Sequence, residues 1–215
     1  ARLSLDRGAR DRMGLNLDDI VEGRVDAQVS SLSDGAGQHY DLDLTPARLT
    51  IPGLGWVKGA GVPATLSFDL IPVEGGERVE NVNFAGEGFG FSGSALIDDA
   101  IGLAAAEIER FALRPGDSMR FSMKATEAGY AIEASGEAFD VRGVISDATG
   151  TGEGTGGETP DIAVKATIGQ AIGFNGEVVS NAKVALVISN GEPTDLSVAG
   201  TLRGRPLRAT YRDTP

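Results

Sequence analysis

The stretch from Ser118 to Ser135 reads SMRFSMKATEAGYAIEAS, with apolar residues at every second position on either side of a central turn sequence. A period of two places successive side chains on opposite faces of a β-strand. The stretch therefore predicts a hairpin that turns at Glu127-Ala128-Gly129. A shift of one residue would exchange the faces, so we expect a firmly fixed pairing. The apolar face is predicted to carry Met119, Phe121, Met123, Tyr130 and Ile132, and the polar face Arg120, Ser122, Lys124, Glu133 and Ser135.

The same alternation continues in both directions along the chain. Apolar residues alternate with polar ones over 25–29 and 40–44, and Leu66, Phe68 and Leu70 alternate with Ser67 and Asp69. A second hairpin is predicted from Ala182–Ser189 and Thr194–Leu202, because the intervening Asn190-Gly191 suits the two positive-φ positions of a type I′ turn. Residues 207–211 predict one more strand. The chain is therefore expected to be all-β.

Helix signals are few. Asp6 precedes Arg7–Met13 and Gly14, an order that predicts an N-cap, two helical turns and a C-terminal glycine. The stretch Ala100–Phe111 is ambiguous, since its alanines favour a helix. We favour a strand there, because Phe111 and Leu113 lead into the turn sequence Pro115-Gly116.

A Gly/Thr/Glu-rich tract interrupts this pattern between Ala148 and Pro160. It has no large apolar residue to bury, so we interpret residues 148–160 as a linker or long loop. Residues 1–147 then form a β-rich segment, and residues 161–215 continue the same sheet as hairpin strands. The predicted fold is an antiparallel, curved, elongated β-sheet or groove, or an open sandwich, with one or two short helices.

Composition limits the function. The 215 residues carry a formal net charge of −12, which disfavours nucleic acid and anionic headgroups as partners. The absence of cysteine excludes thiol chemistry, disulfides and cysteine-based zinc sites. No apolar run is long enough to span a bilayer, and no signal peptide is visible. Because the chain begins at Ala1 and stops just after a predicted strand, we interpret it as part of a longer protein.

No catalytic, cofactor-binding or metal-binding residue is predicted. The spacing Gly88-x-Gly90-x-x-Gly93 matches a dinucleotide fingerprint, but no helix start follows it, so a strand bulge, a bend or close sheet packing is favoured. His39 is the only histidine and is interpreted as a solvated residue at a loop edge. The pairs Asp41/Asp43 and Asp98/Asp99 lack the ligand spacing of a calcium loop and are interpreted as an outward strand face and a turn. Asp117 is interpreted as a turn residue, and Trp56 as a core residue.

Several short stretches follow one another along nearly the whole chain: Leu5–Leu15, Gly23–Val25, Asp43–Ala47, Leu54–Lys58, Val82–Phe84, Phe91–Gly93, Gly116–Asp117, Gly136–Asp140, Ile172–Val178 and Val198–Gly200. In this order they resemble the AsmA-like family of Gram-negative envelope proteins, the YhdP and TamB group. The resemblance implies a segment of a long β-groove across the periplasm, in a parent protein anchored in the inner membrane. It also implies roles in phospholipid movement to the outer membrane and in envelope integrity, with no catalytic residues.

Two functions remain open beside a less favoured third, an enzyme acting on envelope glycans. The first is a lipid conduit, in which the apolar sheet face contacts phospholipid acyl chains and neighbouring segments of the parent chain continue the groove. The second is a structural or assembly module acting through exposed strand edges. A non-enzymatic protein is expected, with no cofactor, no nucleic-acid partner and no membrane contact except through a parent anchor. The candidate lipid-facing residues are Leu66, Phe68, Leu70, Met119, Phe121, Met123, Tyr130 and Ile132.

Overall fold

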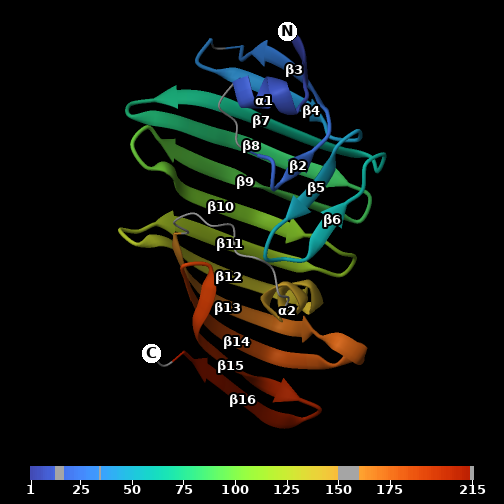
Figure 1. The fold of residues 1–215 in the computed structure, drawn as a ribbon, viewed down its shortest axis with the longest axis vertical. Coiled ribbons are helices and arrows are strands. Elements are labelled where there is room, and N and C mark those ends of the chain that lie inside the picture. Colours follow the sequence, from blue (N-terminus) through green and yellow to red (C-terminus); the bar gives the residue numbers. More distant parts are fainter. Residues whose placement is uncertain (13–16, 34, 150–159, 214–215) are drawn as a thin grey trace.

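The computed structural model describes residues 1–12, 17–33, 35–149 and 160–213, and within them the chain is all-β, as predicted (Figure 1). One open, curved sheet of 13 strands dominates. In spatial order its strands are β1 (Arg2–Leu5), β3 (Val25–Ser31), β4 (Gln38–Asp43), β7 (Ala64–Val73), β8 (Gly76–Gly86), β9 (Phe89–Asp98), β10 (Gly102–Ala112), β11 (Ser118–Ala125), β12 (Gly129–Asp140), β13 (Asp161–Ile172), β14 (Val178–Ser189), β15 (Glu192–Leu202) and β16 (Arg205–Arg212). A separate small sheet contains β2 (Val21–Glu22), β5 (Arg48–Ile51) and β6 (Trp56–Lys58).

The predicted hairpins are confirmed. Met123 in β11 lies opposite Ile132 in β12, which puts the apolar residues of both strands on one face. In the turn between β14 and β15, Asn190 has φ 54° and Gly191 has φ 80°. Both positions therefore have the positive φ that a type I′ turn requires. The stretch Ala100–Phe111 contributes strand β10, as favoured.

The expectation of a wholly antiparallel sheet is wrong at one place. Strand β13 pairs with β12 in parallel, with Ile132 beside Val164. Parallel neighbours need a crossover connection rather than a tight turn, and the chain between Asp140 and Asp161 supplies it. The crossover begins with a helix, α2 (Arg142–Thr149), at a position where no helix was predicted. This helix includes the first two residues of the predicted tract from Ala148 to Pro160, and residues 150–159 lie outside the described residues.

The other helix, α1 (Arg7–Arg12), was predicted, and its N-cap is confirmed. The Asp6 side chain accepts a hydrogen bond from the backbone amide of Ala9 at 2.8 Å. A buried arginine then joins this helix to strand β2 of the small sheet and to the glycine that follows it. Arg10 donates from its guanidinium to the carbonyl oxygens of Gly23 at 2.7 Å and Val21 at 2.9 Å. The predicted C-terminal glycine, Gly14, lies outside the described residues. A 3₁₀ turn, η1 (Phe174–Gly176), links β13 to β14.

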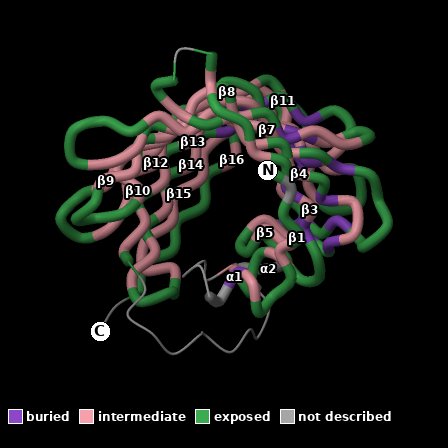
Figure 2. The backbone as a smooth tube through the Cα atoms, turned by 90° about the horizontal axis from the view of Figure 1, so that it is seen from above, coloured by how far each residue is buried: buried purple, intermediate pink, exposed green. Residues whose placement is uncertain are grey.

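The large sheet arches, and α1, α2 and β5 lie inside the arch (Figure 2). The small sheet and the start of α2 pack on one part of the concave face, and we call them the cover. Leu49 and Trp56 of the cover are buried against the large sheet, with Val141 and Val144 beside them. The large sheet contributes the following buried residues to the same core cluster: Val25, Ala64, Phe84, Phe111, Met119, Phe139, Ile168, Ala171 and Ala182.

The molecule exposes far more surface than a compact protein of its size. Its accessible surface is 13371 Å². A compact monomer of the same 22.2 kDa exposes about 9,400 Å² by the usual scaling of area with mass. The cover packs on only part of the concave face, and apolar side chains of the large sheet outside the core cluster, such as Met123 and Ile132, are partly exposed.

Candidate functional site

The candidate site is the part of the concave face that the cover leaves open. Strand pairing aligns apolar side chains there into two rows that cross the sheet perpendicular to the strands. We call these two rows the apolar stripe. One row is Leu70, Val79, Ala95, Ala106, Met123, Ile132, Val164, Leu186, Leu196 and Tyr211. The other is Val82, Gly93, Ile108, Phe121, Ala134, Ala166, Val184, Val198 and Ala209.

No charged side chain occurs in either row, although the first row runs from β7 to β16 and the second from β8 to β16. The members from Leu70 to Val198 are neither fully buried nor fully exposed, and Tyr211 at the sheet edge is 51% exposed. In the next row toward the cover, Phe84, Met119 and Ile168 are buried. The boundary between closed core and open apolar face therefore runs between neighbouring rows of the same strands.

The eight candidate residues share the concave face, but they do not share one environment. Leu70, Phe121, Met123 and Ile132 belong to the apolar stripe, and Tyr130 lies two residues before Ile132 on the same strand face. Two more candidates lie on β7, where Phe68 stacks on Tyr40 with a centroid separation of 4.9 Å and Leu66 packs against the core. Met119 differs from the rest, since it is only 8% exposed beneath the cover. Alternation along β11 could not distinguish Met119 from Met123.

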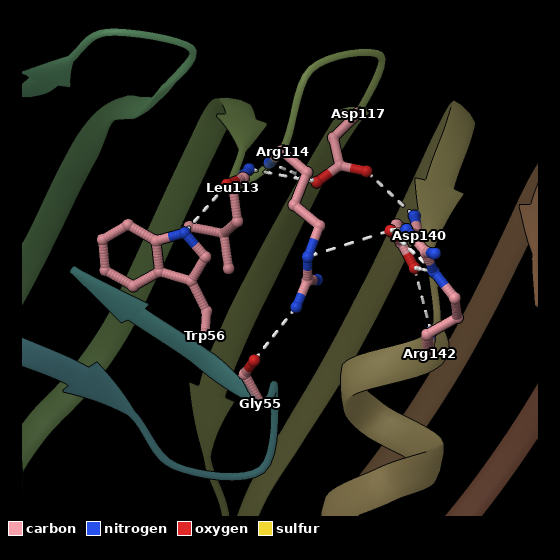
Figure 3. A network of polar contacts seen from close by, with 7 residues as sticks. All are labelled: Gly55, Trp56, Leu113, Arg114, Asp117, Asp140 and Arg142. Atoms are coloured by element: carbon pink, nitrogen blue, oxygen red, sulfur yellow. Dashed lines mark hydrogen bonds and ion pairs between the residues drawn. The ribbon is translucent and has the colours of Figure 1, made fainter. Parts of the chain in front are cut away.

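A polar network fastens the cover to the large sheet (Figure 3). The indole Nε1–H of Trp56 donates to the carbonyl oxygen of Leu113 at 2.8 Å. Arg114 donates from Nη2 to the carbonyl oxygen of Gly55 at 2.9 Å, and its Nε lies 3.8 Å from the Asp140 carboxylate. Trp56 is therefore a core residue, as predicted, and it also forms a directional bond between the two sheets.

Asp117 organises the turn beneath this network. Its Oδ2 accepts hydrogen bonds from the amides of Leu113 at 3.1 Å and Arg114 at 2.9 Å, and its Oδ1 accepts one from the amide of Asp140 at 2.8 Å. The turn interpretation is confirmed by a bond from the Asp117 amide to the Arg114 carbonyl. No local pattern predicted that this side chain would be buried and would join two strands.

Asp140 connects the network to helix α2. It is 5% exposed and accepts bonds from the Arg142 guanidinium, at 2.5 Å to Nη2. The hydrogen bond from Arg142 is the largest of the effects that hold the pKa of Asp140 below its ordinary value, against the opposing effect of burial. Nearby, a Cβ on Gly55 would lie 2.6 Å from the Cα of Gly143, so the cover loop and α2 meet backbone to backbone. Gly55 also has φ +55°, which favours glycine.

His39 is the second residue of β4, next to the loop that precedes this strand, and it lies on the convex, polar face, where it is paired with carboxylates as well as partly solvated. Its Nδ1 is 2.5 Å from Asp69 and its Nε2 is 3.3 Å from Asp41. The Asn81 amide donates to the other Asp69 oxygen at 2.6 Å. The hydrogen bond with Asp69 is the main cause that raises the pKa of His39, and the bond from Asn81 is the main cause that lowers the pKa of Asp69. These contacts join side chains of β4, β7 and β8, so the cluster stabilises the pairing of the three strands.

The other candidate motifs have structural roles. Asp98 closes the turn between β9 and β10 by accepting hydrogen bonds from the amides of Ala100 at 2.8 Å and Ile101 at 3.2 Å. Residues 88–93 form a turn and the start of β9. A Cβ on Gly90 would lie 2.5 Å from the Phe84 carbonyl oxygen, so this glycine serves close packing as favoured. The described residues contain no group of three or more acidic, histidine or cysteine side chains that could hold a metal ion.

Comparison with known proteins adds no relative. No protein-family model, curated protein or solved structure matches the chain significantly. None of the helices in the described parts of the chain has the length and apolar character needed to cross a membrane.

Proposed function

We propose that this chain is a lipid-conduit segment of a periplasm-spanning, AsmA-like protein, and that its apolar stripe carries phospholipid acyl chains between the inner and outer membranes. The observation that carries the proposal is the stripe itself. It is accessible and free of charge across successive strands from β7 to β16. The cover closes only the neighbouring rows.

The physical argument concerns the cost of an open apolar face. Soluble monomers rarely expose continuous apolar patches of more than a few hundred square ångströms, and larger patches mark sites of interaction. An acyl chain lying along the stripe would remove both its own methylene groups and the stripe from water, at about 0.8 kcal/mol per buried methylene. The strands already pair their backbone groups with one another, so an apolar ligand meets few unpaired polar atoms there.

The direction of the stripe supports a conduit over a single closed pocket. Each row runs from strand to strand along the long axis of the molecule in Figure 1. Neighbouring segments of a longer parent could add strands at either edge of the open sheet and extend the same rows. A periplasmic location and an inner-membrane anchor in the parent are parts of this proposal that rest on the sequence resemblance.

The test is native mass spectrometry of the chain purified without detergent from a Gram-negative host. We expect phospholipid to co-purify with the wild type. Leu186→Arg places a long cation in the stripe and should greatly reduce bound lipid. Ala185→Arg makes the same change one residue away on the convex face, where Ala185 is exposed, and should retain the lipid. Consistent absence of lipid from a folded wild-type chain would contradict the conduit.

A structural or assembly module remains the second candidate, because the large sheet has two open edges, β1 and β16. Edge strands can add a strand from a partner chain. This reading predicts no co-purified lipid and loss of partner binding when β16 cannot pair, for example in Ala209→Pro. The same mass spectra therefore separate the two candidates.

A further inference from the structure

The ends of the strands that lie away from the cover carry a row of carboxylates. They occur in or next to the turns β7–β8, β9–β10, β11–β12 and β14–β15 and at the start of β13. We call them the acidic rim: Glu74, Asp98, Asp99, Glu127, Asp161 and Glu192. Every residue of these turns is described, and none of them is lysine or arginine.

Hydrogen bonds between successive turns join parts of the rim. The amide of Asp99 donates to the carbonyl oxygen of Gly75 at 3.0 Å, which connects the β9–β10 turn to the β7–β8 turn. The amide of Asp161 donates to the carbonyl oxygen of Ala128 at 3.0 Å, which connects the start of β13 to the β11–β12 turn. The carboxylates therefore follow the long edge of the concave face, beside the apolar stripe.

The rim carboxylates also lack the arginine partners that other carboxylates of this chain have. At the opposite, covered ends of the strands, arginines face carboxylates, as Arg142 faces Asp140 and Arg203 faces Glu177. No described lysine or arginine forms an ion pair with a rim carboxylate. Four of the six, Glu74, Asp99, Glu127 and Glu192, are exposed. The turns along this edge of the open apolar face therefore carry carboxylates and no cation, and the nearest exposed cations, Arg78 and Lys124, lie within strands β8 and β11.

We propose that the occupant of the apolar stripe is an amphiphile with an ammonium-bearing headgroup, and that the acidic rim selects it over an anionic amphiphile with the same tails. This inference rests on the proposed conduit function and deepens it. The apolar stripe takes the tails, and the ammonium group reaches the rim carboxylates. An anionic headgroup at the same place meets like charges, whose repulsion salt would screen over about 8 Å at physiological ionic strength.

The experiment is a competition read by native mass spectrometry. The folded chain is incubated with vesicles of equal parts phosphatidylethanolamine and phosphatidylglycerol that have identical acyl chains. Both headgroups carry a phosphate, and only the first carries an ammonium. We expect bound phosphatidylethanolamine to exceed bound phosphatidylglycerol by about threefold to tenfold, the range of one or two exposed ion pairs. The excess should fall toward equality in about 0.5 M salt.

A pair of charge-matched variants locates the effect. The rim variant Glu74→Gln/Asp99→Asn/Glu127→Gln/Glu192→Gln should bind as much total lipid as the wild type and lose the preference. The control variant Glu22→Gln/Glu107→Gln/Glu109→Gln/Glu133→Gln removes four exposed charges away from the rim and should keep the preference. Asp98 is left unchanged because it closes its turn.

The outcomes separate this inference from the function on which it rests. Two results would contradict selection by the rim: binding of both lipids without preference, or a preference that persists in the rim variant. Neither result would contradict the conduit function. A folded chain that binds neither lipid would overturn the conduit as well.

Discussion

Trp56 donates its indole N–H to the carbonyl oxygen of Leu113 across 2.8 Å, and this bond joins the small sheet to the large one. The two residues are far apart in the sequence and both are buried. Trp56 also packs edge-on against Phe84 and Phe89 at centroid distances of 6.1 Å and 5.1 Å. The position of the cover, and so the extent of the open stripe beside it, depends on this contact.

Replacing Trp56 by Phe should therefore destabilise the fold by about 2 kcal/mol. The change removes the donor and leaves the buried Leu113 carbonyl without its partner, a loss of about 1–3 kcal/mol. Urea unfolding followed by circular dichroism measures it. Val57→Ala is the control. Val57 directly follows Trp56 and is 48% exposed, so this change should alter the free energy of unfolding by less than about 0.5 kcal/mol. Equal effects of the two changes would show that the bond does not fasten the cover.

Asp117→Ala should cost about 3 kcal/mol or more. The backbone amides of Leu113, Arg114 and Asp140 lose their hydrogen-bond acceptor, so the turn that contains Arg114 is no longer held by the Asp117 side chain. Asp99→Ala, at an exposed turn position, should change the free energy of unfolding by less than about 0.5 kcal/mol. Neither residue is expected to be essential for lipid binding by chains that remain folded. Loss of binding by a folded Asp117→Ala chain would revive a chemical role for this carboxylate.

Stability should depend on pH through His39. Its pKa is raised above the ordinary 6.5, mainly by the bond to Asp69, so its favourable contribution is complete below about pH 6.5 and is lost as the pH rises through the folded-state pKa. Asp69, whose pKa is lowered, loses its contribution only as the pH falls through and below the ordinary 3.8. Denaturant midpoints of the wild type and of His39→Gln at about pH 6 and about pH 8.5 test this. An identical pH dependence in both chains would remove His39 as the cause.

Carboxylates placed on the two sides of the cover boundary should behave differently. Met119→Asp buries an unpaired charge beneath the cover and should destabilise the chain by several kcal/mol. Ile132→Asp places the same group in the stripe, where it reaches water, and should leave the chain folded with a cost of about 1–2 kcal/mol for lost apolar contact. Thermal unfolding compares them. Equal, severe unfolding of both variants would mean that the stripe is an ordinary closed core.

Local patterns predicted much of the large sheet, because period-two alternation and Asn-Gly turns act over a few residues. The parallel pair β12–β13 escaped prediction because it depends on a crossover whose helix, α2, has the mixed sequence RGVISDAT before a glycine-rich tract. The cover escaped prediction for a related reason: β2 and β6 have two and three residues, too few to show a period.

The candidate site also combines features that short sequence patterns predict with features that depend on residues far apart in the sequence. Alternation placed Met119 and Met123 on one face, but Met119 belongs to the buried core cluster that also contains Trp56 and Phe139, whereas Met123 does not. Of the two carboxylates beside His39, Asp69 lies 30 residues away in the sequence, beyond any local pattern. The acidic residues of the rim were visible singly as turn residues, and their alignment along one edge follows from the strand order alone.

The most direct test of the central claim is photo-crosslinking at two adjacent positions of β12. p-Benzoylphenylalanine in place of Ile132 projects from the apolar stripe, and in place of Glu133 it projects from the convex face. Both folded chains are illuminated in the presence of phospholipid vesicles and analysed by mass spectrometry for a covalent phospholipid adduct. The conduit predicts a lipid adduct at position 132 and none above background at position 133. Equal labelling at both positions, or none at position 132, would contradict it.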